Sequence, residues 1–187
     1  ICAAFLHDVV EDTEYTVEDI EMNFGKKIAS LVDGLTKISG GIFGDKASAQ
    51  AENFRKLLLT MADDIRVILI KMADRLHNMR TLSSMLPSKQ YKIAGETLYI
   101  YSPLAHRLGL FAIKTELEDL SFKYEHPEQY ANIKKAIADS EKSRACAFND
   151  FSAPVMAGLN KMGLKFDMFA RVKSAYSIWN KMNSKHI

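Results

Sequence analysis

The chain has 187 residues, of which 48% are hydrophobic and 26% charged, a composition typical of a globular protein with one large or two small domains. Its formal net charge of +2 gives no case for a basic surface field, so nucleic-acid binding, including direct DNA binding, is not expected. No apolar run approaches the length of a membrane span and no signal peptide is visible, so no membrane association is expected.

The first predicted element is a mostly buried helix over residues 3–12, whose last six residues carry one imidazole and three carboxylates. In a continuous helix, residues four apart share a face, which would place His7 over Glu11 and Asp8 over Asp12. Carboxylates crowded in this way repel one another unless a positive group offsets them. Imidazole and carboxylate ligands suit Mn, Fe or Zn, so the pattern favours a divalent metal site. The alternative is a solvated helix end with a capping acid.

Capping residues and glycines divide the next part of the chain. Thr16 is a predicted N-cap for a helix over 17–24, Asp19 has the capping-box spacing, and Gly25 ends the helix. The glycine-rich segment 39–46 is predicted to be a loop that is either a lid near the site or a plain surface excursion. The flanking helices are predicted over 26–38 and 49–61.

A strongly apolar helix is predicted over residues 63–82, with acidic residues at its N-terminus where the helix dipole favours them. Asp74 follows the apolar run 65–70, and a carboxylate in this setting requires a partner. Asn78 lies one turn later on the same face of the helix.

The remaining sequence is predicted to be helical almost to its end. Pro103 should kink or restart a helix over 89–108, and Pro154 should kink the pattern that follows. Residues 164–169 alternate like a half-buried strand, and a basic turn then leads into a helix near Ala175. The other helices are predicted over 111–124 and, as one helix or two, over 128–162.

Four runs resemble the hydrolase half of the RelA/SpoT homologues, the long bacterial enzymes that make and destroy the alarmone (p)ppGpp. The runs are LHDVVEDT, QAENFRKLLLTMADDIRVILIKMADRLHNMRTL, YSPLAHRLGL and ELEDLSFKY, and the likeness extends over the whole chain. The resemblance implies a mainly α fold. It also implies three parts: a helical HD-type hydrolase bundle over 1–126, a helical linker over 127–163, and a strand and helix over 164–187 that begin an α/β synthetase domain.

The resemblance implies Mn2+-dependent hydrolysis of the 3′-pyrophosphate of ppGpp or pppGpp, which yields GDP or GTP and pyrophosphate. The matching metal ligands are His7, Asp8 and Asp74, and the matching carboxylates that handle the attacking water are Glu11 and Asp12. In the same stringent-response enzymes, the synthetase half transfers pyrophosphate from ATP to GDP or GTP.

The nucleotide contact implied by the resemblance is Asn78, with Thr81 as a weaker candidate. Without the resemblance, Asn78 is equally well explained as a buried amide bonded to a neighbouring helix. The family's fourth metal ligand is a histidine about two dozen residues before the His-Asp pair, near a basic clamp, and both would precede Ile1. The chain opens inside a predicted helix without an initiator Met, as expected of a fragment or of a chain with a preceding segment.

Four residues match the ATP-contacting start of the family's synthetase in the pattern R-x-K-x-x-x-S-x-x-x-K: Arg171, Lys173, Ser177 and Lys181. The alternative is an ordinary solvated basic turn, and Ala170 stands where the family usually has Gly. The Mg2+ ligands of the synthetase would lie beyond Ile187, and contact with the ribosome is expected only through regions outside this chain.

Two other functions compete with this interpretation. An HD-type phosphohydrolase of another nucleotide, such as NADPH or a cyclic nucleotide, is less favoured because the chain carries the Glu-Asp pair and the synthetase-like tail. A catalytically silent regulatory module is less favoured because silent family members lack the His-Asp and Glu-Asp residues. Cys2 and Cys146 form no metal or redox motif and are predicted to be buried or half-buried thiols in a reducing cytoplasm.

Overall fold

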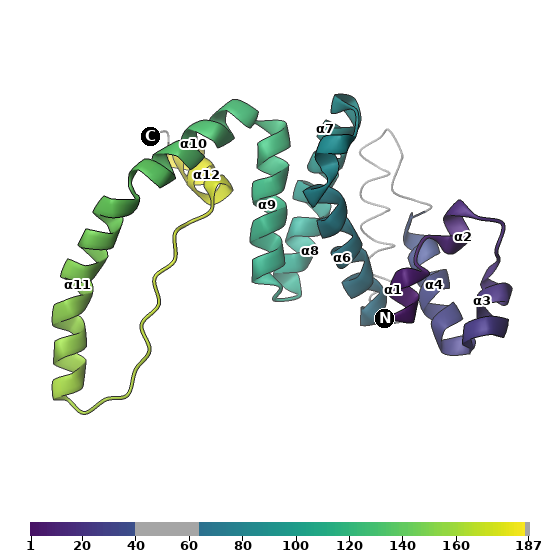
Figure 1. Ribbon diagram of the computed structural model, residues 1–187, viewed down its shortest axis with the longest axis horizontal. Helices are drawn as coiled ribbons and strands as arrows, with labels where there is room; N and C mark the ends of the chain where they lie inside the picture. The colour runs from purple at the N-terminus through teal and green to yellow at the C-terminus, as the bar shows by residue number, and fades with distance from the viewer. Residues whose placement is uncertain (40–63, 186–187) are drawn as a thin grey trace. The chain divides into compact units, whose positions relative to one another are not determined.

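The computed structural model describes residues 1–39 and 64–185 (Figure 1). Every regular element in these ranges is a helix, so the mainly α expectation is confirmed. Contacts divide the chain into two compact units, one of Ile1–Ser84 with Pro103–Gly109 and one of Met85–Ser102 with Leu110–Ile187. Within the described ranges, no helix has the length and apolar character needed to cross a membrane.

The first unit opens with a broken helix rather than the continuous one predicted over 3–12. Leu6 to Asp8 form a turn in which the Val9 N–H donates to the Leu6 carbonyl three residues back. Only Ala3 of residues 3–12 is buried, so the prediction that this segment is mostly buried was also wrong. The helices of this unit are α1 (Cys2–Phe5), α2 (Val9–Asp12), α3 (Val17–Phe24), α4 (Lys26–Ser39), α6 (Ile65–Arg80), η1 (Leu82–Ser84) and α8 (Ser102–Arg107).

Helix α3 begins and ends where the sequence predicted. The Thr16 side chain accepts a hydrogen bond from the Asp19 N–H at 3.2 Å, and Asp19 Oδ2 accepts one from the Thr16 N–H at 2.9 Å. This capping box satisfies two backbone donors that a helix start would otherwise leave open. Gly25 ends the helix with a φ of +84°, a conformation that glycine adopts without strain.

Helix α4 is the scaffold of the first unit because it contacts α1, α2, α3 and α6. Val32 and Leu35 on α4 are fully buried, as are Ile68 and Met72 on α6. Each such side chain contributes about 1.5–3 kcal/mol through removal of its surface from water. The packing therefore fixes α6 against the helix that also holds the α1–α2 turn.

The second unit contains the predicted interruption before Pro103. Helix α7 passes into a π-helix over Thr97–Tyr101, and α8 starts at Ser102. Because proline lacks an N–H and its ring crowds the carbonyl four residues earlier, a regular helix cannot continue through this point. The helices of this unit are α7 (Pro87–Glu96), η2 (Thr97–Tyr101), α9 (Phe111–Glu125), α10 (Pro127–Asp139), α11 (Glu141–Lys161, containing Pro154) and α12 (Ala175–Lys185).

An aromatic cluster joins α9, α10 and α12, which contact one another pairwise. The Phe122 ring is fully buried, and its centroid lies 4.9 Å from that of Trp179 and about 6 Å from those of Tyr130 and Tyr176. His126 completes the cluster with its ring centroid 4.7 Å from that of Trp179. Helix α12 is thus packed into the helical bundle of this unit (Figure 1).

Two further expectations differ from the structure. Residues 164–169, predicted to be a half-buried strand, run without regular secondary structure, and Leu164 and Phe169 are exposed. A strand requires a hydrogen-bonded neighbour, and no strand occurs within the described ranges to provide one. Cys2 on α1 and Cys146 on α11 are exposed, so the prediction that they are buried or half-buried was wrong.

The two contact units do not coincide with the predicted boundaries near residues 126 and 163, which remain predictions about the family's domains. The predicted helix 49–61 and nearly all of the predicted loop 39–46 lie outside the described residues.

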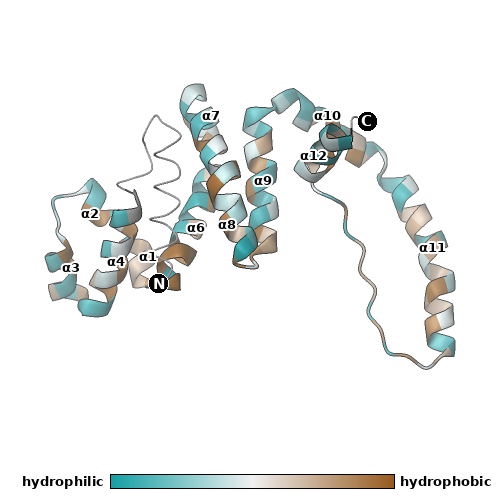
Figure 2. Cartoon of the chain, turned by 180° about the vertical axis from the view of Figure 1, so that it is seen from behind, coloured by the Kyte–Doolittle hydropathy of each residue, from teal (hydrophilic) through white to brown (hydrophobic). Residues whose placement is uncertain are grey.

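Apolar residues recur along α11 (Figure 2), and four of them, Phe148, Phe151, Val155 and Met156, are exposed.

Candidate metal centre

The turn between α1 and α2 directs the His7 ring toward α6. Its Nδ1 lies 2.8 Å from the Ala4 carbonyl oxygen. Since a carbonyl only accepts, Nδ1 must carry the proton and donate it. In a neutral ring with this tautomer the lone pair belongs to Nε2, which is the arrangement found in metal-bound histidines.

Two carboxylates approach this nitrogen. Asp8 is the N-cap residue of α2, but its side chain makes no cap hydrogen bond, and its Oδ2 lies 2.9 Å from His7 Nε2. Asp74 on α6 places its Oδ1 3.5 Å from the same nitrogen. The structure therefore brings together the three predicted ligands from positions 67 residues apart in sequence.

The donor atoms fit a divalent cation. One nitrogen of His7 and one oxygen each of Asp8 and Asp74 all lie within 4.8 Å of one another. A nitrogen lone pair facing two carboxylate oxygens is stable only with a proton or a cation between them. Imidazole with two carboxylates suits Mn, Fe or Zn, and exposure of part of Asp8 leaves a side open to solvent.

The Asp74 carboxylate is held from both sides by its own helix. The Asn78 side-chain N–H donates to Oδ1 at 2.9 Å, and the Lys71 ammonium lies 3.4 Å from Oδ2. Asn78 and Lys71 are thus the partners that the sequence predicted a carboxylate beside an apolar run to require. Asn78 is exposed and bonded within α6, so the alternative of a buried amide bonded to a neighbouring helix is wrong.

The remaining predicted residues of the hydrolase site lie on the surface. Glu11 and Asp12 are exposed in α2, and their backbone N–H groups donate to the Asp8 carbonyl. His7 and Glu11 do not lie in one continuous helix, because the helix breaks at residues 6–8. The predicted turn from Asp8 to Asp12 is present, since the Asp12 N–H donates to the Asp8 carbonyl four residues back. Thr81 is exposed at the end of α6, where its hydroxyl donates to the His77 carbonyl at 3.1 Å.

Comparison with known proteins identifies the family to which the chain belongs. A family model described as an HD domain matches residues 1–111, more than half of the chain. The chain belongs to the HD domain family.

Curated relatives agree with the resemblance found in the sequence. The bifunctional (p)ppGpp synthase/hydrolase SpoT of Escherichia coli strain K12 is 49% identical over 182 residues, which are 97% of this chain and 26% of the relative. The guanosine-3′,5′-bis(diphosphate) 3′-pyrophosphohydrolase of Haemophilus influenzae is 47% identical over 185 residues, 99% of this chain and 27% of the relative. The GTP pyrophosphokinase of Myxococcus xanthus is 47% identical over 192 residues, covering 100% of this chain and 25% of the relative.

The chain spans about a quarter of the length of the curated relatives that it matches. The predicted likeness to the long RelA/SpoT homologues is confirmed, because these relatives carry (p)ppGpp-related names and are 47–49% identical to the chain over nearly its whole length. The HD domain match ends at residue 111, so the segment with the predicted ATP contacts lies outside it.

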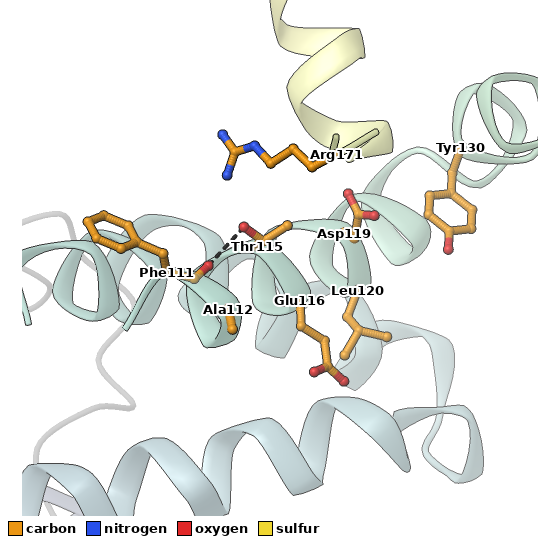
Figure 3. Close-up of a pocket in the computed structure, with 8 residues that line it drawn as sticks. All are labelled: Phe111, Ala112, Thr115, Glu116, Asp119, Leu120, Tyr130 and Arg171. Carbon is orange, nitrogen blue, oxygen red and sulfur yellow. Dashed lines mark hydrogen bonds between the residues drawn. The ribbon is translucent and has the colours of Figure 1, made fainter. Parts of the chain in front are cut away.

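The predicted ATP contacts lie around the start of α12. Arg171 and Lys173 are exposed on the preceding segment and line a cavity of about 550 Å3 together with Arg144 of α11. Ser177 is half-buried in the first turn of α12, and Lys181 is exposed one turn later. Arg171 also lines a second cavity of about 570 Å3 along α9, where its side chain extends over Thr115 (Figure 3).

Asp119 of α9, which the sequence analysis did not single out, caps α12. Its carboxylate accepts hydrogen bonds from the backbone N–H groups of Tyr176 at 2.9 Å and Ala175 at 3.4 Å. Both N–H groups are therefore occupied, and a phosphate bound near Arg171 would rely on side chains or displace Asp119. Nothing in the sequence pattern predicted this contact, because the partners lie 56 and 57 residues apart.

Proposed function

We propose that this HD domain removes the 3′-pyrophosphate from ppGpp or pppGpp, releasing GDP or GTP and pyrophosphate. The observation that supports it best is the convergence of His7, Asp8 and Asp74 in a chain about 47–49% identical to proteins named for this hydrolysis. The tail that resembles the start of a synthetase favours the alarmone over another nucleotide, and it lies within the match to relatives named as a (p)ppGpp synthase/hydrolase and as a GTP pyrophosphokinase.

Mn2+ is the proposed ion, held by His7, Asp8 and Asp74. When bound, such an ion supplies positive charge for the phosphates and acidifies a coordinated water. The chain's own part is to hold the ligands: the Ala4 carbonyl fixes the His7 tautomer, and Asn78 and Lys71 fix the Asp74 carboxylate.

Glu11 and Asp12 are proposed to accept the proton of the attacking water. They lie in the first turn of α2, three and four residues after Asp8, and both are exposed to solvent. A positioned carboxylate of this kind accelerates hydrolysis by roughly 10²–10⁴-fold. Asn78 and Thr81, which follow Asp74 along α6, are proposed to face the nucleotide.

We further propose that the intact protein transfers pyrophosphate from ATP to GDP or GTP, with Arg171, Lys173, Ser177 and Lys181 contacting ATP. The carboxylates that would bind Mg2+ for this reaction are not among these residues. Placement of Arg171 and Lys173 on the wall of one cavity supports their shared role.

The hydrolase proposal is tested by pyrophosphate release from ppGpp in the intact protein with Mn2+ and with a chelator. His7→Ala and Asp74→Asn should abolish release and lower the bound manganese. Asp150→Asn, the same chemical change at an exposed position of α11, should preserve both.

Three other outcomes would refute the proposal in distinguishable ways. Full activity of both site variants with stoichiometric metal would exclude the ligand assignment. Manganese binding without any nucleotide hydrolysis would indicate a silent regulatory module. Hydrolysis of NADPH or a cyclic nucleotide in place of ppGpp would indicate a different substrate.

A further inference from the structure

Lys71 is a buried cation directed at the metal centre, in a position that no sequence motif marked as functional. It directly follows the apolar run 65–70 of α6, three residues before Asp74, and its side chain is only 11% exposed. Its ammonium lies 3.4 Å from Asp74 Oδ2, the one charged partner of Lys71 within the described residues. Burial of an ammonium costs several kcal/mol unless a partner offsets it, so the placement of Lys71 is tied to Asp74.

The two oxygens of Asp74 have different neighbours. Lys71 approaches Oδ2, whereas Asn78 and His7 approach Oδ1. The oxygen that faces the His7 nitrogen is therefore not the one that the ammonium occupies. Lys71 can stay beside the carboxylate while an ion binds on the other side.

The charges show what Lys71 does in each state. With neutral His7, the negative Asp8 and Asp74 and the positive Lys71 sum to a net charge of −1, and a divalent ion changes this to +1. Without Lys71, the same side chains would carry −2 when empty and 0 when loaded. Lys71 thus offsets carboxylate repulsion between the ligands of the empty site and opposes the ion on binding.

We propose that Lys71 is a built-in counter-cation of the metal site, which stabilises the empty site and weakens binding of the divalent ion. This inference rests on the proposed metal-dependent function. In the partly buried surroundings of α6, charge interactions are screened less than in open solvent. Removal of the ammonium should therefore tighten metal binding, whereas a role confined to orienting Asp74 predicts the opposite.

The first test is a titration of Mn2+ into the intact protein, with free Mn2+ followed by electron paramagnetic resonance. Lys71→Met, which keeps an unbranched apolar stem but removes the ammonium, should bind Mn2+ at least about tenfold more tightly than wild type. Lys71→Arg, which keeps the charge, should bind with nearly wild-type affinity. Unchanged or weaker binding by Lys71→Met would overturn the proposal.

The second test measures unfolding of the metal-free protein in a chelator for wild type, Lys71→Met, Asp74→Asn and the double variant. Lys71→Met should be less stable than wild type, because Asp74 loses its cation. In the Asp74→Asn background the same change should be stabilising, because it removes a buried ammonium without a partner. If Lys71→Met alone does not fold, the comparison of Asp74→Asn with the double variant still tests the proposal. Additive effects of the two substitutions, or destabilisation by Lys71→Met in both backgrounds, would overturn it.

Neither measurement uses a nucleotide. Both results can hold while ppGpp is not hydrolysed, in which case only the proposed substrate fails. If ppGpp is hydrolysed but the charge effects are absent, the role assigned to Lys71 fails and the proposed function stands.

Discussion

Substitution of Asp119 tests whether one side chain of α9 docks α12. Asp119→Ala removes the acceptor of the Tyr176 N–H bond at 2.9 Å and of the longer Ala175 bond at 3.4 Å. Loss of an N-cap side chain costs about 0.5–2 kcal/mol, and the second bond is too long to add much. We expect local destabilisation of α12 by about 1–2 kcal/mol, with the aromatic cluster around Phe122 retaining part of the docking.

The assay is hydrogen exchange of the peptide spanning α12, measured by mass spectrometry. A local loss of about 1–2 kcal/mol should accelerate exchange of its first-turn amides roughly 5–30-fold. Asp119→Asn is the matched control, because asparagine is an equally good N-cap acceptor and should exchange almost as slowly as wild type. Equal exchange in Asp119→Ala and wild type would refute the role of this carboxylate in docking α12.

The other predictions concern two glutamates. Glu11→Gln should keep the metal and lose at least about a hundredfold in hydrolysis rate, since it removes a proton acceptor; Glu14→Gln is the exposed control, and metal loss in Glu11→Gln would instead make Glu11 a ligand. Burial raises the pKa of Glu125 above its ordinary 4.5. At pH 7 the carboxylate is therefore more stable in the unfolded chain than in the folded protein, and its charge lowers the free energy of unfolding. Glu125→Gln should therefore raise the unfolding temperature at pH 7, and the gain should disappear below about pH 4.5, where both states are protonated. A gain that persists at low pH would show that charge is not its cause.

Local sequence signals predicted the ends of most helices. Thr16, Asp19 and Gly25 define α3 through bonds and dihedral angles that involve only neighbouring residues. The helix predicted from residue 128 begins one residue earlier, at Pro127, and the predicted interruption before Pro103 is present. These features depend on the backbone of a single turn, and a single turn is what a sequence pattern describes.

Predictions failed where a local pattern had more than one solution. The alternation over 164–169 is compatible with a strand, but a strand exists only beside another, and the described residues provide none. The apolar run 3–12 is compatible with one helix, but it breaks at Leu6 to Asp8. The break changes the site, because it turns the carboxylate of Asp8 to the His7 nitrogen.

The sequence by itself determined the helical fold and the family likeness and predicted the types of metal ligand, because side-chain chemistry and helical period are properties of residue order. It did not determine which groups meet. The 3.5 Å approach of His7 to Asp74, the cap that Asp119 places on α12 and the burial of Lys71 beside Asp74 exist only through packing. Such contacts depend on how α4 holds its neighbours and how the aromatic cluster joins α9 to α12. Both are long-range consequences of apolar burial, which fixes positions that no local pattern encodes.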